Sequence, residues 1–500
     1  MENKSLKKQT ITGFIWRLAE RTGAQGVQFV VSLVLARLLA PEVYGTVALI
    51  TVFTSILGVF IDSGLGQALM QKKDADDLDF STVFYFNMAM CTTLYIGMFI
   101  AAPFIAKFYN RAELVALTRV LCISLIVTGF KAMPQSYAFR NMLFKKFFFA
   151  TLGGTIFSAF LGIFIAYKGG GAWAIVAQNL SNAIIDTVIL WITVKWRPKL
   201  MFSFKRLKGL FSYGWKLLAS ALIDRGYNSL RTLIIGKVYS PADLGYYNKA
   251  RNFPSIIIEN VNNSIDSVLL PSMSKVQDSK EAVKSMTRRA MKTSTYVMAP
   301  LLIGLAACGK SLISLLITDK WLPSYPYMVI FCFTFVFYPV HTANLNAIKA
   351  MGRSDLFLKL EIIKKIVGII SIVITMFISP LAMALSLLAT GILSQIINSW
   401  PNKKLMNYSY LEQLKDILPG ILLAAFMGGC VYCVNFLHLN SVVTLLIQVP
   451  LGAAIYIGLS YLFKLESFTY CFNIVKPTIL KLKNKAREET EQETETTKEE

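Results

Sequence analysis

Charged residues and histidines are scarce in this sequence. Only 16% of its 500 residues are charged, and the two histidines, His341 and His438, are too far apart to suggest a metal site. The seven cysteines follow no disulfide framework. Cys430 and Cys433 form a CxxC pattern, but it lies in an apolar segment without nearby histidine or acidic ligands. We therefore expect no metal site and no cofactor.

Long polar segments are also missing. No connection on the predicted outer side has room for a soluble domain, which counts against membrane glycosyltransferases, polymerases and ligases. Residues 304–311 match the letters of a P-loop, but they lie inside an apolar segment with no preceding strand, so they do not predict ATP binding. The sequence is typical of a protein that moves a substrate, and we expect no enzyme activity.

Apolar stretches of about 20 residues recur along the chain, each long enough to cross a bilayer core. Hydrophobic residues make up 55% of the sequence, and the formal net charge of +22 is spread over short connections on one side of the predicted membrane. This positive-inside pattern explains the charge better than a nucleic-acid partner does. We expect an all-α polytopic protein of the bacterial cytoplasmic (inner) membrane, with both termini cytoplasmic. About 14 spans are predicted, at 10–37, 44–70, 80–106, 114–137, 148–167, 172–194, 212–236, 245–270, 294–317, 325–348, 360–378, 381–400, 417–436 and 441–463.

The chain contains an internal repeat. The second copy gains about one helical turn relative to the first, which keeps side chains on the same face. Two similar halves in a hydrophobic chain predict a transporter whose two lobes rock around a shared site. A duplicated helical hairpin with no site between the copies is the alternative. The matching segments are Trp16-Arg17-Leu18 with Trp215-Lys216-Leu217, Pro41 to Gly45 with Pro241 to Gly245, and Ile61 to Leu65 with Ile265 to Leu269.

The repeat and the loop composition divide the chain into two pseudo-symmetric six-helix lobes plus a C-terminal helix pair. Because one chain supplies both lobes, we expect a monomer. The tail is basic and then almost entirely Glu, Thr, Gln and Lys, so we expect it to be disordered and cytoplasmic. The predicted domains are an N-terminal lobe at 1–194, a cytoplasmic basic linker at 195–211, a C-terminal lobe at 212–400, an additional pair at 401–464 and the tail at 465–500.

Polar and charged residues interrupt the first, second, seventh and eighth predicted spans. A charge at mid-bilayer costs about 2.5–3.5 kcal/mol on insertion scales, so each one needs a reason. We predict a hydrated cavity between the lobes, whose basic side chains bind an anion; Arg suits phosphate because its planar fork donates two hydrogen bonds. The predicted anion ligands are Arg17, Arg21, Lys216, Arg225 and Arg231. The predicted polar lining, with groups for a coupling H+ or Na+, is Glu20, Gln25, Gln28, Asp62, Asp224, Asn252, Glu259 and Asp266.

Internal salt bridges are the alternative explanation of these charges. Arg17 and Glu20 are three residues apart on one helix, and Arg21 is a possible partner of Asp224 across the lobes. Isolated charges in other spans, Arg119, Lys131, Asp186 and Lys310, are interpreted as pairs inside a lobe or as side chains that snorkel to water.

Three segments resemble the opening of bacterial polysaccharide transporters. They are Gly13-Phe-Ile-Trp16, Leu35 to Gly45, and Phe60 to Leu69. These transporters are the Wzx-type oligosaccharide-lipid flippases of the multidrug/oligosaccharidyl-lipid/polysaccharide exporter superfamily. The similarity is greatest to the branch that exports colanic and teichuronic acids, and it covers most of residues 5 to 465.

The resemblance implies a substrate, an oligosaccharide repeat unit on undecaprenyl pyrophosphate, flipped from the inner to the outer leaflet. It implies alternating access driven by an ion gradient, and polysaccharide polymerase or assembly proteins as partners, for capsule, exopolysaccharide or O-antigen assembly. A flippase for the peptidoglycan lipid precursor and a cation-coupled multidrug exporter remain alternatives. The bases at Arg17, Arg21, Lys216, Arg225 and Arg231 count against the drug exporter, which favours an acidic and aromatic cavity.

Overall fold

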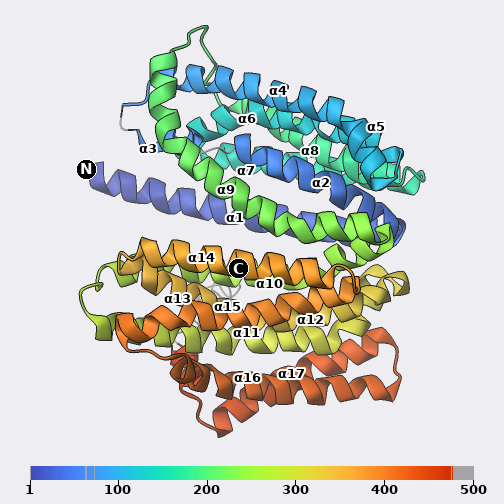
Figure 1. The fold of residues 1–500 in the computed structure, drawn as a ribbon, viewed down its shortest axis with the longest axis vertical. Coiled ribbons are helices and arrows are strands. Elements are labelled where there is room, and N and C mark those ends of the chain that lie inside the picture. Colours follow the sequence, from blue (N-terminus) through green and yellow to red (C-terminus); the bar gives the residue numbers. More distant parts are fainter. Residues whose placement is uncertain (1, 62–64, 73, 474–475, 477–500) are drawn as a thin grey trace, which may run out of the picture. The chain divides into compact units, whose positions relative to one another are not determined.

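Helices make up the regular structure of the chain. The computed structural model describes residues 2–61, 65–72, 74–473 and 476, and within these ranges it contains helices and no strands, which confirms the all-α prediction (Figure 1). In chain order the elements are α1 (Glu2–Leu38), α2 (Pro41–Ile61), α3 (Leu65–Gln71), α4 (Asp77–Tyr109), α5 (Glu113–Leu121), α6 (Ile123–Arg140), α7 (Phe144–Tyr167), α8 (Ala172–Thr193), α9 (Phe204–Val238), α10 (Pro241–Ser274), α11 (Lys280–Ile317), the 3-10 turn η1 (Asp319–Ser324), α12 (Tyr325–Val336), α13 (Tyr338–Ala350), α14 (Ser354–Thr375), α15 (Pro380–Met406), α16 (Tyr410–Cys433), η2 (Val434–Leu437) and α17 (Ser441–Leu462).

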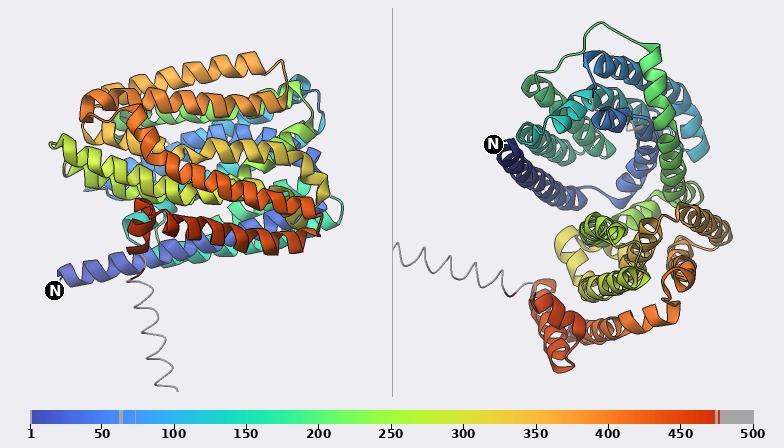
Figure 2. Two further views of the ribbon diagram at one scale, coloured as in Figure 1. Left: turned by 90° about the horizontal axis from the view of Figure 1, so that it is seen from below. Right: turned by 90° about the vertical axis from the view of Figure 1, so that its left-hand side faces the viewer.

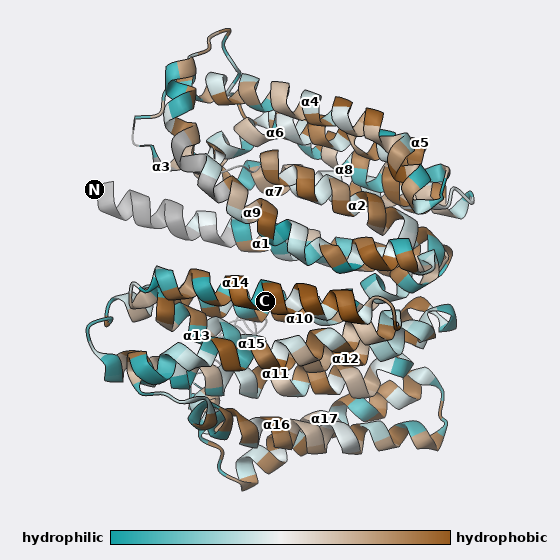
Figure 3. Cartoon of the chain, viewed as in Figure 1, coloured by the Kyte–Doolittle hydropathy of each residue, from teal (hydrophilic) through white to brown (hydrophobic). Residues whose placement is uncertain are grey.

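Ten helical segments in the described ranges are long and apolar enough to cross a membrane, so the chain is a multi-pass membrane protein. The predicted count of about 14 is not reached by this criterion. The four other helices at predicted spans, α1, α9, α10 and α14, are 37, 35, 34 and 22 residues long but are less apolar or, in α14, carry more charged residues. Three of these, α1, α9 and α10, carry most of the predicted site residues, and Figure 3 shows hydrophilic patches along α1 and α9. Polarity, rather than shortness, separates these helices from the other ten.

The chain forms two compact units. Unit 1 comprises residues 1–249 and 316–321, and unit 2 comprises residues 250–315 and 322–500. The division falls inside α10, so α9 groups with the N-terminal helices; the predicted lobe boundaries stay a prediction. Within each unit the helices run side by side (Figure 2).

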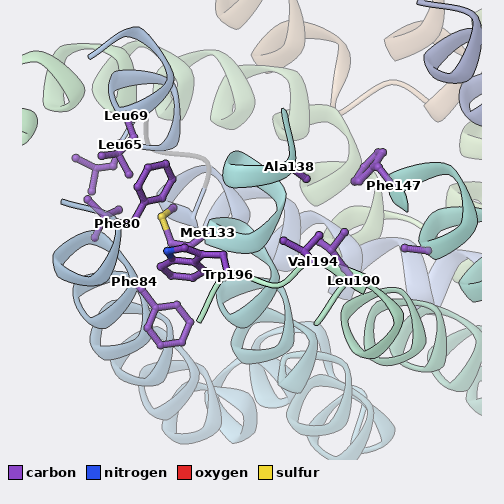
Figure 4. Packing of buried hydrophobic residues seen from close by; sticks show 12 residues of the cluster. Leu65, Leu69, Phe80, Phe84, Met133, Ala138, Phe147, Leu190, Val194 and Trp196 are labelled. Carbon is purple, nitrogen blue, oxygen red and sulfur yellow. The ribbon is translucent and has the colours of Figure 1, made fainter. Parts of the chain in front are cut away.

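One core cluster of unit 1 is rich in aromatic side chains and includes the start of α4. Phe80 and Phe84 of α4 pack with Met133 of α6, Leu190 of α8 and Trp196, which follows α8 (Figure 4). Trp196 is 6% exposed and lies 5.9 Å from the Phe80 ring centre. Burying such rings contributes a large share of packing energy, so Trp196 anchors the start of the segment that joins α8 to α9.

The basic linker is held on the first turns of α4. The backbone N–H groups of Lys199 and Ser203 donate hydrogen bonds to the hydroxyls of Ser81 and Thr82, at 3.0 and 3.1 Å. Arg206 contacts Asp79, also at 3.0 Å. The segment predicted as a connector is therefore attached to unit 1 along most of its length.

Unit 2 is held together by a buried amide network. The Asn344 amide of α13 donates to Gln413 Oε1 of α16 at 2.9 Å and to Ser399 Oγ of α15 at 3.2 Å. Asn402 of α15 donates to Asn344 Oδ1. Apolar lipid gives helices little hydrophobic reason to associate, so side-chain hydrogen bonds of this kind specify which helices pack.

The two repeat copies have the same helix breaks. Helix α1 ends at Leu38 and α2 begins at Pro41, while α9 ends at Val238 and α10 begins at Pro241. Proline is favoured at the first position of a helix because its missing N–H has no intrahelical partner there. The predicted alignment of Pro41 with Pro241 thus corresponds to equivalent structural positions.

Two further sequence interpretations are confirmed. The P-loop letters at 304–311 lie within α11, in helical backbone on both sides. The break expected at Ser379 and Pro380 is present, since Ser379 caps α15 by accepting a hydrogen bond from the Ala382 N–H.

Candidate functional site

Helix α1 presents a polar stripe on its surface. Arg17, Arg21, Gln25 and Gln28 are all exposed, and their spacing places them on one helical face, as predicted. Because an exposed arginine on a membrane-length helix is costly in lipid, this face needs a hydrated surrounding. The stripe is the strongest feature of the predicted anion site in unit 1.

Helix α9 carries a second set of predicted residues. Asp224 and Arg225 are exposed, and Asp224 accepts a hydrogen bond from Asn228 at 3.1 Å. Arg231 differs, since it is 7% exposed and lies in the packed part of unit 1. The side chain of Lys216 lies outside the described residues.

Apart from Glu20 of α1, the remaining predicted residues belong to unit 2 or lie outside the described ranges. Asn252 and Glu259 are exposed on α10, and Asp266 accepts a hydrogen bond from Asn346 at 2.8 Å. Asp62 is outside the described residues. That these groups share one cavity with the arginines of unit 1 stays a prediction.

The predicted salt bridge on α1 is present. Arg17 contacts Glu20 at 2.7 Å, and the Arg17 side chain keeps 45% of its surface exposed. No ion pair joins Arg21 to Asp224 in the described ranges, and within them Arg21 has no carboxylate partner. Arg21 and Arg225 are therefore better placed than Arg17 to bind an external anion.

A buried charge network extends from this pair into unit 1. Lys131 of α6 forms an ion pair with Asp186 of α8, which confirms the interpretation of both as an internal pair. The ring of Phe147 in α7 lies between the two pairs, 5.2 Å from the Arg17 guanidinium and 5.6 Å from the Lys131 ammonium. Glu20 is 8% exposed and Asp186 is 6% exposed. Asp186 Oδ1 has no hydrogen-bond partner among the described residues.

The Lys131–Asp186 pair yields a stability prediction. We expect Asp186→Asn to lower the free energy of unfolding by up to about 3–5 kcal/mol, because it leaves the Lys131 ammonium, whose side chain is only 19% exposed, without its counter-charge. Thermal melting in detergent measures this loss. The double variant Lys131→Met with Asp186→Leu removes both charges and should recover most of the stability. Equal melting of Asp186→Asn and the wild type would show that the pair does not stabilise unit 1.

The sequence analysis missed a buried charge inside a predicted span. Lys249 in α10 is 3% exposed, although it lies within a predicted span. The offset that aligns Pro241 with Pro41 in the repeat also aligns Lys249 with Leu49. Leu49 is buried as well. Comparing the two copies residue by residue, rather than searching for polar stripes, would have revealed this exchange of leucine for lysine.

Comparison with known proteins places the chain in a family. The profile of the polysaccharide biosynthesis protein family matches residues 34–326, which is more than half of the chain. The chain therefore belongs to this family of polysaccharide biosynthesis proteins, as the opening motifs indicated.

Three relatives are 23–28% identical to this chain over the aligned segments. The chain is 28% identical over 313 residues to the teichuronic acid biosynthesis protein TuaB of Bacillus subtilis, covering 61% of this chain and 63% of that protein. It is 23% identical to the succinoglycan biosynthesis transport protein ExoT of Rhizobium meliloti, covering 64% and 65%. It is 24% identical to the lipopolysaccharide biosynthesis protein WzxC of Escherichia coli, covering 83% and 82%. The matches to the first two span slightly less than two thirds of those relatives.

Solved structures share the fold. A lipid II flippase, MurJ, in an inward closed conformation superimposes with a TM-score of 0.68 at 17% identity, covering 91% of this chain and 98% of that one. An inward-facing multidrug resistance transporter of the MATE family gives 0.58 at 12% identity, covering 78% and 98%. At these identities the likeness concerns the fold alone.

Proposed function

We propose that this protein is a transporter that flips undecaprenyl-pyrophosphate-linked oligosaccharide repeat units from the inner to the outer leaflet of the cytoplasmic membrane. The match to the polysaccharide biosynthesis family over more than half of the chain carries the proposal. The polysaccharide-related names of the relatives, one of them a transport protein, support it. Both termini are cytoplasmic in this proposal, since that orientation places the basic connections inside.

The exposed arginines fit the anionic end of such a substrate. Arg21 and Arg225 are exposed on α1 and α9 and lack ion-pair partners in the described ranges. A guanidinium donates two parallel hydrogen bonds to a phosphate group. We propose that these two side chains bind the pyrophosphate, with Arg17, Lys216 and Arg231 as the further ligands named from the sequence.

Alternating access needs a source of energy, and we propose a H+ or Na+ gradient. Glu20 and Asp186 are buried carboxylates, and Asp186 keeps one oxygen without a partner among the described residues. A buried carboxylate in a membrane-spanning helix is a functional candidate by default. In this proposal the protein acts as a monomer, without a metal or cofactor and without enzyme activity.

Two rival functions share this fold. The structural likeness to a lipid II flippase keeps the peptidoglycan precursor as an alternative substrate, and the likeness to a MATE transporter keeps drug export. The family match favours the polysaccharide substrate. The exposed arginines of the polar stripe on α1 favour an anionic lipid over a cationic drug as the substrate.

Deletion of the gene followed by lipid extraction tests the proposal. We expect one complete lipid-linked repeat unit to accumulate, because synthesis continues while flipping stops. Mass spectrometry of the undecaprenyl-linked oligosaccharides measures it, and complementation with the intact gene should remove it. Accumulation of the peptidoglycan precursor instead would support the first rival, and unchanged lipid pools would support drug export.

A further inference from the structure

One end of unit 1 contains a buried cation that the proposed anion site does not use. Lys249 Nζ donates a hydrogen bond to the carbonyl oxygen of Ser32 in α1, at 3.0 Å. The ammonium lies 5.1 Å from the ring centre of Tyr44 and 5.9 Å from that of Trp321. No carboxylate pairs with it among the described residues. An ammonium has three donors, and here it meets one carbonyl and two aromatic faces.

Other contacts at this end hold the α1–α2 connection against residues 316–321. Trp321 Nε1 donates to the carbonyl oxygen of Ala36 at 2.8 Å. Lys320 Nζ donates to the Arg37 carbonyl at 2.7 Å, and Arg37 Nε donates to the Leu316 carbonyl at 2.8 Å. None of these three hydrogen bonds involves the Lys249 ammonium, so they can form whether or not that residue is charged.

The two repeat connections also touch directly. A Cβ at Gly45 would lie 1.9 Å from the carbonyl oxygen of Pro241, and a Cβ at Gly245 would lie 2.1 Å from that of Pro41. This reciprocal contact brings the starts of α2 and α10 together at backbone distance. We define the connection contact as Gly45, Gly245, Pro41 and Pro241.

The burial of the Lys249 ammonium has a desolvation cost that lowers the stability of the closed connection contact. An ammonium taken out of water loses its hydration, and one carbonyl with two aromatic faces replaces only part of it. If the connections separate, the ammonium returns to water and recovers that loss. Its repeat counterpart Leu49 has no charge and so has no such preference for the separated state.

We propose that Lys249 is the opening element of a gate formed by the connection contact at the outer end of the protein. Its buried charge lowers the stability of the closed contact relative to the open state, so that the gate can open and the substrate can leave. This inference rests on the proposed transport function and orientation. It makes Lys249 a positioning residue whose effect is on the balance between closed and open states.

Lys249→Met tests this directly. Methionine has a similar length and can keep contact with Tyr44 and Trp321, but it carries no charge. We expect a higher melting temperature than the wild type and about tenfold slower labelling of Ala36→Cys by a membrane-impermeant maleimide added outside. Ala36 is fully buried, and its carbonyl accepts the Trp321 hydrogen bond at this end, so we expect a cysteine there to react only when the connections separate. Labelling is done with Cys430, Cys433 and Cys471, which are not buried, replaced by Ser.

Two further variants act as controls. Lys249→Arg keeps the charge and should keep the wild-type labelling rate. Lys237→Met is the matched lysine, because Lys237 also donates to a carbonyl, that of Phe108, and lies 4.4 Å from the Phe108 ring, but is exposed. It should give no rise in melting temperature and no slower labelling.

Each result for Lys249→Met either supports or overturns the proposed role of its charge. A lower melting temperature, faster labelling or loss of folding in Lys249→Met would overturn the proposal and make Lys249 a clamp of the closed state. Unchanged melting and labelling would overturn it as well. Both measurements work without substrate, so they remain interpretable if the lipid extraction rejects the flippase function. If that function holds, Lys249→Met should also accumulate the lipid-linked repeat unit.

Discussion

Replacing Arg21 with Gln is expected to lower export of the lipid-linked oligosaccharide by about tenfold or more, with unchanged amounts of protein in the membrane. Arg21 is exposed on α1 and has no carboxylate partner among the described residues, so its removal breaks no ion pair of the fold. A hydrogen bond to a charged group contributes about 1.5–3 kcal/mol, and tenfold corresponds to about 1.4 kcal/mol. The ratio of accumulated lipid-linked repeat units to surface polysaccharide measures the change.

Arg225→Gln should act in the same direction, because Arg225 is exposed and has no ion-pair partner among the residues that the structure describes. Arg21→Lys keeps the charge but loses the planar fork, so an intermediate loss is expected. Lys205→Gln, at an exposed position in the first turn of α9, is the matched control and should export normally. Full export by both arginine variants at wild-type protein levels would remove the anion-site hypothesis.

Arg231→Gln tests the same site less cleanly. The sequence places Arg231 on the same helical face as Asp224, yet the structure buries it. Loss of a buried charge changes packing as well as binding. We therefore expect less folded protein for this variant, which its melting temperature will show.

The polar stripe of α1 was predictable because helical periodicity depends only on spacing along one helix. Arg17, Arg21 and the two glutamines after them are three or four residues apart, which fixes their common face. Contacts between helices have no such rule. Lys131 and Asp186 are 55 residues apart on α6 and α8, and no spacing in the sequence determines the register of those two helices.

Helix ends were predictable where proline marks them and unpredictable where polar segments continue a helix. Pro41 and Pro241 mark the starts of α2 and α10. Helix α11 instead begins at Lys280, well before the predicted span at 294–317, because an apolar-run search stops where charges begin. The added turns are held by ion pairs such as Arg288 with Asp416 at 2.6 Å, which joins segments 128 residues apart.

Replacing Gly45 with Ala is expected to lower the melting temperature by roughly 2–6 °C, because overpacking costs about 1–3 kcal/mol and more where the neighbour cannot move. Here the neighbour is the carbonyl oxygen of Pro241, a backbone atom 1.9 Å from the new Cβ. Thermal melting in detergent measures the loss. Gly58→Ala is the matched control, since Gly58 lies in the same helix and, among the described residues, no neighbour outside its own stretch of helix backbone comes within 4 Å of the new Cβ. Alanine also favours the helix.

Gly45→Ala and Lys249→Met should shift the gate in opposite directions. The added methyl group is accommodated only when the connections separate, so Gly45→Ala should speed labelling of Ala36→Cys, whereas Lys249→Met should slow it. Gly245→Ala should behave like Gly45→Ala, because its Cβ would lie 2.1 Å from the Pro41 carbonyl. Equal melting of Gly45→Ala and Gly58→Ala would contradict the close approach itself. Lower melting without faster labelling would mean that the connection contact supports the fold but does not open.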